Sequence, residues 1–252
     1  MATVDLDRLS MRRKERAFLC GGTEVGKSTL SDCLADDFLQ RYRTDKPNTC
    51  ARELLLDTKP RYRAEARLMG PSIRRRYKGW DHGPTVPGSV VVDDPADLSM
   101  AWEMGYRRVI MQGESSADVP RLVEGCAAFL RSSRAGRPQL LRVDETLDFF
   151  HQNGAPRGGD DALLRAARAG RERGTAALYC SQRTKGLPPQ LMEELTRLYA
   201  FRLDFVKDAQ RFQEMGAPDF ELPTRQRQFM YWWKLDPDRR VYGPYTLDLS
   251  GA

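Results

Sequence analysis

The sequence has little of the material from which zinc sites, disulfides and histidine catalysis are built. Its 252 residues include only two histidines, His82 and His151, which lie far apart in the chain. The five cysteines show no C-x-x-C spacing, and two of them fall in or beside apolar segments. This scarcity argues against a zinc centre and against histidine-based acid–base catalysis, and it favours reduced thiols over disulfides.

Long apolar segments are also missing. No stretch reaches the roughly 18 consecutive apolar residues that indicate a transmembrane helix, and residues 1–16 mix acidic and basic side chains where a secretory signal needs an apolar run. We therefore expect a soluble, intracellular protein with no intrinsic membrane anchor. The length favours one large α/β domain over two, so we predict a single domain over residues 1–252.

A phosphate-binding motif stands near the start of the chain. Residues 21–28 read Gly-Gly-Thr-Glu-Val-Gly-Lys-Ser and match G-x-x-x-x-G-K-[ST]. An apolar strand over 17–20 precedes the motif and an amphipathic helix over 28–40 follows it, which argues against a chance glycine turn before a lysine. Backbone N–H groups and the helix N-terminus then face the phosphates. The predicted nucleotide-binding residues are Gly21, Gly22, Thr23, Glu24, Val25, Gly26, Lys27, Ser28 and Thr29.

Together with the phosphate loop, Asp144, Glu145 and Gln182 complete a hydrolytic site. We expect Lys27 to reach the β and γ phosphates of ATP and Ser28 to bind Mg²⁺. A strand over 139–144 ends in Asp144, a second Mg²⁺ ligand, and Glu145, which would orient or deprotonate the attacking water. Two carboxylates at a loop start are alternatively a solvated cap. Gln182, at the tip of a strand over 176–181, is a candidate sensor of the γ-phosphate.

The order of apolar runs predicts alternating strands and helices. Such alternation is typical of a mostly parallel sheet with helices on both faces and ligands at the carboxyl ends of the strands. We predict strands at 17–20, 53–57, 89–92, 108–112, 139–144, 176–181, 198–203 and 229–235, and helices at 28–40, 95–104, 116–131, 160–173, 188–195 and 207–215. Residues 1–15 are an N-terminal extension, and 228–247 form a C-terminal β-hairpin.

Positive charge gathers in one segment. Between Lys59 and Lys78 there are eight basic residues against one acid, Glu65, so the local net charge is +7. Aromatic residues lie among these charges, which suits contact with nucleic-acid phosphates and bases. We assign residues 59–88 to a basic, irregular insertion. Its DNA-binding candidates are Arg74, Arg75, Arg76 and Lys78, and the alternative is a solvated basic connection without a partner.

The order of these motifs resembles the FtsK/HerA superfamily of DNA-pumping P-loop ATPases. The resemblance covers residues 15–235 and rests on the phosphate loop, the acidic-ended segment 54–59, V-D-E at 143–145, G-R-x-x-G at 170–174, S-Q-R at 181–183 and L-P-P-Q-L at 187–191. Glu145 sets the chain apart from small-molecule kinases and switch GTPases, and no N-K-x-D guanine motif is present. Glu24 departs from the family, which often has a small residue there.

The resemblance implies a RecA-like (ASCE) core in a homo-oligomeric ring, usually a hexamer, with ATP at subunit interfaces and double-stranded DNA in the channel. It makes Arg171 the arginine that acts on a neighbouring subunit, whereas a solvated helix face is the plain interpretation of Arg165, Arg168, Arg171 and Arg173. The compact chain looks most like the genome-packaging ATPases of tailless, membrane-containing viruses. That likeness implies the host cytoplasm or a virion packaging vertex as location, and capsid or portal proteins as partners.

Three functions are open at this point. The first is an ATP-hydrolysing DNA translocase that packages a viral or mobile-element genome. The second is a non-motor ATP-binding switch or assembly factor, which does not require the hydrolytic carboxylate of Glu145. The third is a filamentous-phage-type assembly ATPase, which normally includes a membrane anchor.

Overall fold

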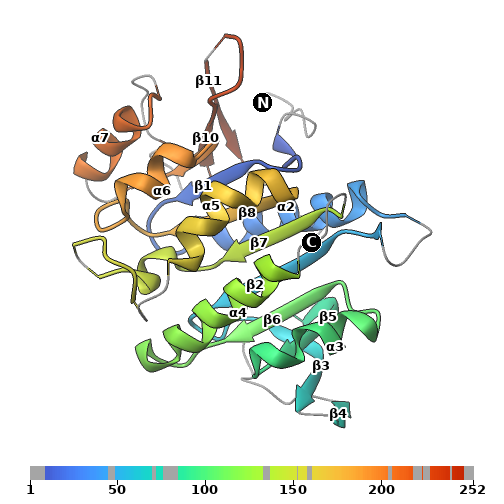
Figure 1. The fold of residues 1–252 in the computed structure, drawn as a ribbon. Helices are drawn as coiled ribbons and strands as arrows, with labels where there is room; N and C mark the ends of the chain where they lie inside the picture. The colour runs from blue at the N-terminus through green and yellow to red at the C-terminus, as the bar shows by residue number, and fades with distance from the viewer. Residues whose placement is uncertain are drawn as a thin grey trace.

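A computed structural model gives the fold of the chain (Figure 1). It describes residues 9–44, 49–69, 72–75, 85–132, 137–151, 153–157, 161–203, 206–217, 223, 228–238 and 240–246. The strands are β1 (Arg16–Cys20), β2 (Arg52–Asp57), β3 (Arg63–Met69), β4 (Ser72–Arg75), β5 (Thr85–Val92), β6 (Arg108–Gln112), β7 (Gln139–Val143), β8 (Thr175–Ser181), β9 (Arg197–Phe201), β10 (Gln228–Trp233) and β11 (Val241–Thr246). The α-helices are α2 (Lys27–Arg41), α3 (Leu98–Glu103), α4 (Val119–Arg131), α5 (Ala162–Arg173), α6 (Pro189–Glu194) and α7 (Val206–Glu214). Single 3-10 turns are η2 (Pro95–Asp97), η3 (Ser116–Asp118) and η4 (Thr146–Phe149).

The described strands form one sheet in the order β11-β10-β9-β1-β8-β7-β2-β6-β5-β3-β4. Strands β9 through β3 in this order run parallel, whereas β10, β11 and β4 pair antiparallel to their neighbours. The adjacent strands β1, β8, β7 and β2 therefore all end at the same edge of the sheet. The predicted α/β fold with a mostly parallel sheet and a C-terminal hairpin is confirmed.

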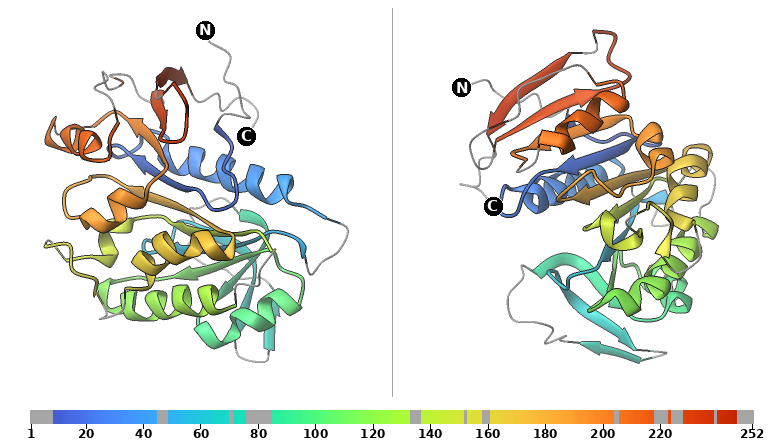
Figure 2. Two further views of the ribbon diagram at one scale, coloured as in Figure 1. Left: turned by 45° about the horizontal axis from the view of Figure 1, so that its top comes forward. Right: turned by 90° about the vertical axis from the view of Figure 1, so that its left-hand side faces the viewer.

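Helices cover both faces of the sheet, but unevenly (Figure 2). Alternate residues of each strand point to opposite faces. In β1, Phe18 and Cys20 join the core under α3 to α7, whereas Ala17 and Leu19 join the core under α2. Among the described helices α2 alone covers that second face, so the helix that follows the phosphate loop packs directly on the strands that end at the site.

A partly buried ion-pair cluster fixes α2 to the sheet. It consists of Asp32 and Asp36 on α2, Glu53 on β2, Arg108 on β6 and Arg142 on β7. Glu53 is fully buried and contacts both arginines, at 2.7 Å from Arg142 Nε and 2.9 Å from Arg108 Nε. Arg142 also pairs with Asp32, and Arg108 with Asp36. The cluster ties α2 to three neighbouring strands beneath it.

The interpretation of residues 59–88 as irregular is wrong for much of the segment. It contains β3, β4 and the first part of β5, which begins at Thr85 rather than at the predicted Ser89. In β3 the side chains alternate: Ala64, Ala66 and Leu68 are buried, while Glu65 is exposed. That period of two is a strand signal, and the density of charge concealed it.

The first and last segments that the structure describes pack toward the β9–β11 side of the sheet, opposite β4. In the predicted N-terminal extension, Leu9 and Met11 are buried in the α2-side core, and the Leu9 carbonyl accepts a hydrogen bond from the hydroxyl of Tyr199 at 2.5 Å. At the other end β10 and β11 form the predicted hairpin, and Asp236 Oδ1 accepts the N–H of Asp238 in its turn. No helix in the described part of the chain is long and apolar enough to span a bilayer.

Candidate nucleotide-hydrolysis site

The phosphate loop leaves β1 through a glycine that packing requires. A Cβ on Gly21 would lie 2.5 Å from the Cβ of Phe201 on β9, so a larger residue would force the loop away from the sheet. Backbone hydrogen bonds hold the loop there: Gly21 N–H donates to the Ser181 carbonyl and Gly22 N–H to the Arg202 carbonyl. The loop is thus fixed to the strand on each side of β1.

Two residues of the loop adopt left-handed backbone conformations. Gly26, at φ 102°, makes the turn into α2, and glycine takes that conformation without steric cost. Glu24 has φ 58°, where a side chain costs about 1–2 kcal/mol. The departure noted at Glu24 is therefore a position at which the backbone favours glycine.

Lys27 and the start of α2 face the cavity. Gly26 caps α2 without a side-chain hydrogen bond, so no side chain competes for the N–H groups of the first turn. The Lys27 ammonium donates to the carbonyls of Gly21, at 2.6 Å, and Gly22. Burial lowers the pKa of Lys27, so this cation gains from an anionic phosphate partner.

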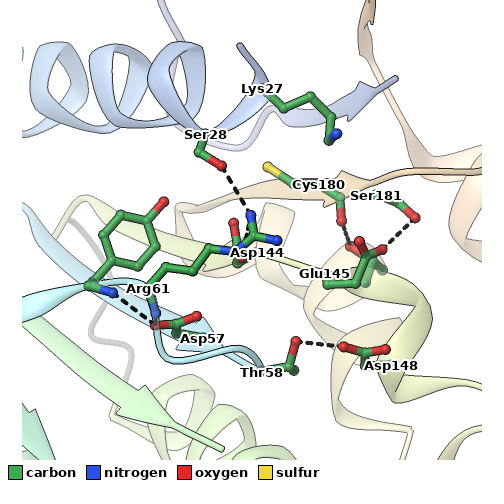
Figure 3. A network of polar contacts seen from close by, with 12 residues as sticks. Lys27, Ser28, Asp57, Thr58, Arg61, Asp144, Glu145, Asp148, Cys180 and Ser181 are labelled. Atoms are coloured by element: carbon green, nitrogen blue, oxygen red, sulfur yellow. Dashed lines mark hydrogen bonds and ion pairs between the residues drawn. The ribbon is translucent and has the colours of Figure 1, made fainter. Parts of the chain in front are cut away.

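Most of the predicted nucleotide-binding and hydrolytic residues meet around one cavity of about 220 Å³, whereas Gly21 and Gly22 are not part of its lining. Its walls come from the phosphate loop and from the ends of β7 and β8, together with one residue that follows β2 (Figure 3). The lining residues are Thr23, Glu24, Val25, Gly26, Lys27, Ser28, Thr29, Arg61, Asp144, Glu145, Cys180 and Gln182. The structure thus brings together residues predicted from three separate segments, with Gln182 on the wall where the sensor was expected.

The two carboxylates after β7 have different surroundings. Asp144 points toward Ser28, and Arg61 Nη1 lies 3.5 Å from its Oδ2. Glu145 accepts a hydrogen bond from Ser181 Oγ at 2.8 Å, and its side chain is buried. Burial raises the pKa of Glu145, while the Ser181 hydrogen bond opposes that rise. A carboxylate held in place with a raised pKa suits general-base chemistry on a water molecule.

A third carboxylate, Asp57 at the end of β2, lies behind Asp144. Its Oδ2 accepts the N–H of Arg61 at 2.8 Å, the N–H of Tyr62 at 3.3 Å and the side-chain amide of Gln112 at 3.3 Å. Burial and the charge of Asp144 raise the pKa of Asp57 to about 6. Asp57 therefore anchors the segment that brings Arg61 to the cavity.

The donor set at Ser28 and Asp144 fits a hard cation such as Mg²⁺. Asp144 Oδ2 is shielded from solvent and accepts no hydrogen bond from the described residues. Ser28 Oγ lies 3.3 Å from the same Arg61 nitrogen that contacts Asp144, so one cation can reach both oxygens. Mg²⁺ is usually held by one or two such protein oxygens together with substrate phosphates.

Solved structures with similar folds include the genome-packaging NTPase B204 of Sulfolobus turreted icosahedral virus 2 in complex with ATP-γ-S. It has a TM-score of 0.60 and 14% identity, and the match covers 94% of this chain and 100% of B204. The DNA-packaging ATPase B204 of Sulfolobus turreted icosahedral virus has a TM-score of 0.59 and 13% identity, and the match covers 94% of this chain and 100% of B204. EssC (ATPases 2 and 3) of Geobacillus thermodenitrificans has a TM-score of 0.52 and 11% identity, and the match covers 93% of this chain and 40% of the EssC chain.

This chain has the P-loop ATPase fold of these proteins. At 11–14% identity these matches show a shared fold, and that fold agrees with the one that the motif resemblance implies. No family model matches the sequence, and no curated protein matches it.

Some of the predicted functional residues lie away from the cavity. Arg171 is on the last turns of α5, whose end leads into the start of β8, whereas the cavity lies at the end of β8. The side chain of Arg171 lies outside the described residues. Arg74 and Arg75 belong to the edge strand β4, their side chains are not described, and Arg76 and Lys78 lie outside the described residues.

Sequence reasoning missed Arg61 and Asp57 as members of the site. The sequence identifies Arg61 only as a member of the basic run and Asp57 only as the acidic end of a strand. Both follow from topology: β2 is the neighbour of β7, so the residues after β2 lie beside those after β7. Arg67, another member of the basic run, pairs instead with Asp93 through two hydrogen bonds of 2.8 and 2.7 Å.

Proposed function

We propose that this chain is an ATPase that uses Mg²⁺ and drives double-stranded DNA translocation during packaging of a viral or mobile-element genome. The observation that supports hydrolysis most strongly is Glu145, a buried carboxylate held by Ser181 on the wall of the same cavity as Lys27 and Asp144. A switch that only binds nucleotide has no need of this group. The fold match to two genome-packaging ATPases supports the packaging role.

The residues divide the work of hydrolysis in the following way. Lys27 and the N-terminus of α2 bind the phosphates, and the loop turns at Gly21 and Gly26 bring backbone N–H groups toward them. Ser28 and Asp144 hold Mg²⁺, which neutralises charge on the phosphates when bound. Glu145 accepts the proton of the attacking water, and Gln182 orients that water against the γ-phosphate.

The first experiment is the steady-state ATPase rate with and without linear double-stranded DNA. We expect DNA to stimulate hydrolysis, and Lys27→Ala to abolish turnover because it removes the phosphate contact. Hydrolysis that ignores DNA would favour a switch or assembly factor, and so would nucleotide binding without turnover. The Lys27→Ala protein also controls for a contaminating ATPase.

A ring with shared active sites follows from the proposed role of Arg171. The end of α5 is too far from its own cavity to serve it, so Arg171 would stabilise transition-state charge on a neighbouring subunit. Arg173, close by, donates instead to the Leu130 carbonyl at 3.0 Å. We expect mixing of inactive Lys27→Ala and Arg171→Ala proteins to restore part of the ATPase rate.

Complementation works because a mixed interface can combine an intact loop with an intact arginine. The matched control is Arg168→Ala, on the exposed face of the same helix. Activity retained by Arg171→Ala and lost by Arg168→Ala would move the trans-acting role to Arg168. Two inactive proteins that stay inactive after mixing and exchange would contradict a shared site.

DNA contact is tested separately on the edge strand β4. We expect Arg74, Arg75 and Arg76, replaced together by alanine, to weaken duplex binding and to flatten its salt dependence. Arg240→Ala, whose side chain is 73% exposed near the other edge of the sheet, is the control for an exposed charge outside the region. If the salt dependence of duplex binding is unchanged in the triple variant, the segment is a solvated basic connection without a nucleic-acid partner.

A further inference from the structure

Arg61 lies where two oxygens of the site converge. Its Nη1 is 3.3 Å from Ser28 Oγ and 3.5 Å from Asp144 Oδ2, so a single nitrogen contacts both groups (Figure 3). Its side chain is 42% exposed and forms part of the cavity wall, whereas that of Asp144 is only 3% exposed. Among the described residues, Arg61 is the one that forms an ion pair with Asp144 within 4.0 Å.

The backbone at Arg61 is held in place from behind. Asp57 Oδ2 accepts the N–H of both Arg61 and Tyr62, and the Gln112 amide donates to the Tyr62 carbonyl at 2.7 Å. Tyr62 itself is buried. The guanidinium therefore extends into the cavity from a fixed root, which restricts it to positions within one side-chain length of that root.

An ordinary surface ion pair does not account for this arrangement. Exposed pairs contribute little, because solvent screens both partners. Here the acid is buried, its Oδ2 accepts no hydrogen bond from the described residues, and the cation also contacts a hydroxyl of the phosphate loop. Both oxygens are the groups that the proposed function assigns to Mg²⁺, and a guanidinium and a dication repel each other at such distances.

We propose that Arg61 competes with Mg²⁺ for the position between Ser28 and Asp144 and thereby sets the metal affinity of the site. The proposal rests on the proposed ATPase function for the identity of the metal, but the competition concerns only groups of this chain. Arg61 keeps Asp144 paired while no metal is bound, and metal entry requires the guanidinium to leave. Without Arg61, the same two oxygens bind a divalent cation more tightly.

The test is a Mn²⁺ titration followed by electron paramagnetic resonance, in which Mn²⁺ replaces Mg²⁺. Arg61→Gln removes the charge and keeps a polar, though shorter, side chain. We expect its Mn²⁺ dissociation constant, with ADP present, to fall roughly tenfold, the size of effect that a nearby charge has on an ionic equilibrium. Arg67→Gln, which removes a charge from the same segment but outside the cavity, should match wild type.

A second comparison tests whether Asp144 supplies the oxygen for which Arg61 and the metal compete. We expect Arg61→Gln with Asp144→Asn to lose the gain in Mn²⁺ affinity, because the oxygen for which the two cations compete has lost its charge. An equal gain in Arg67→Gln would mean that only general electrostatics is at work. Unchanged or weaker Mn²⁺ binding in Arg61→Gln would overturn the proposal.

The same titration without nucleotide separates this inference from the proposed function. If a fluorescent ATP analogue fails to bind wild type, the ATPase assignment fails, yet Arg61→Gln must still bind Mn²⁺ more tightly than wild type if competition is real. If the analogue binds and Mn²⁺ affinity does not respond to Arg61→Gln, the ATPase assignment stands and the competition does not. Circular dichroism spectra of the variants check that each is folded.

Discussion

Two groups of charged residues lie on neighbouring parts of the same strands, and they are used in opposite ways. In the partly buried ion-pair cluster, each acid contacts an arginine, and Glu53 contacts two. Burial raises the pKa of Glu145 on the cavity wall and of Asp57 behind it, where hydrogen bonds oppose the rise. Burial also raises the pKa of Asp32 in the cluster, but there the charge of Arg142 opposes the rise. Each acid of the cluster thus faces an arginine of the chain, whereas Asp57 and Glu145 face hydrogen-bond donors. In the proposed function, a bound metal would add positive charge beside these two acids.

The largest effect should come from the cavity. Glu145→Gln keeps the shape of the side chain and removes its basicity, so we expect turnover to fall by roughly 100- to 10,000-fold. Binding of a fluorescent ATP analogue should persist, because Lys27 and the loop are intact. Phosphate release and analogue binding are measured side by side, with Lys27→Ala as the variant that loses both. Hydrolysis at the wild-type rate would remove Glu145 from the mechanism.

The ion-pair cluster should respond in stability instead. Arg142 is almost fully buried, and its loss leaves Glu53 and Asp32 short of a cation. We expect Arg142→Met to lower the free energy of unfolding by about 3–5 kcal/mol, as when one partner of a buried pair is removed. Urea titration measures the loss. Arg41→Met, which breaks the exposed pair with Asp37, should cost less than about 1 kcal/mol.

A small loss of stability in Arg142→Met would mean that solvent, which already reaches Asp32, compensates for the missing cation. A second variant tests the same explanation by restoring the charge balance of the cluster. Arg142→Met combined with Glu53→Met and Asp32→Leu removes the acids that have lost their cation. The triple variant should recover part of the stability lost by the single variant. Continued loss with each added substitution would show that the three side chains contribute independently.

The fold was predictable where each strand is a short apolar run. Strands β1, β2, β6, β7 and β8 were placed from such runs within one residue at each end, because buried parallel strands are apolar on both faces. β3 was missed since its buried residues are two alanines and one leucine among charges. The alternation was visible in the sequence, but a charged segment at a sheet edge resembles a loop.

The site was predictable where a motif specifies local backbone. The phosphate loop and the Asp144–Glu145 pair depend on a few consecutive residues, and the cavity brings them together as expected. Arg61 contacts Ser28 and Asp144 across 33 and 83 positions of sequence, so its role depends on strand order. The ion pair of Arg142 could have been predicted from the sequence, because an arginine inside an otherwise apolar strand needs a buried acid as partner.

A smaller effect should come from the hydroxyl that holds Glu145. Ser181→Ala removes the hydrogen bond that opposes the rise in the pKa of Glu145, so that pKa should rise further. A base works when deprotonated, and the acid limb of the turnover profile should therefore move to higher pH. We expect a loss of roughly tenfold at neutral pH, measured as rate against pH. An unshifted profile with a reduced plateau would mean that Ser181 acts only in packing.

The smallest expected effect is the pH dependence of stability that Asp57 produces, which tests the difference between the cavity acids and the ion-pair cluster. The pKa of Asp57 is raised to about 6 from a usual value of 3.8, so the folded state binds this proton more tightly than the unfolded state. Stability contributed by the protonated form is present at low pH and is lost as the pH rises through about 6.

Asparagine at this position cannot ionise but still accepts the N–H of Arg61. In the absence of metal and nucleotide, we expect Asp57→Asn to gain about 1 kcal/mol of unfolding free energy relative to wild type between pH 5 and pH 7.5. Urea unfolding at the two pH values measures that difference. Glu65→Gln, an exposed acid of β3, is the control and should show no such change. A constant difference between Asp57→Asn and wild type would mean that Asp57 binds its proton no more tightly in the folded state than in the unfolded state, and the contrast between the two groups would then rest on Glu145 alone.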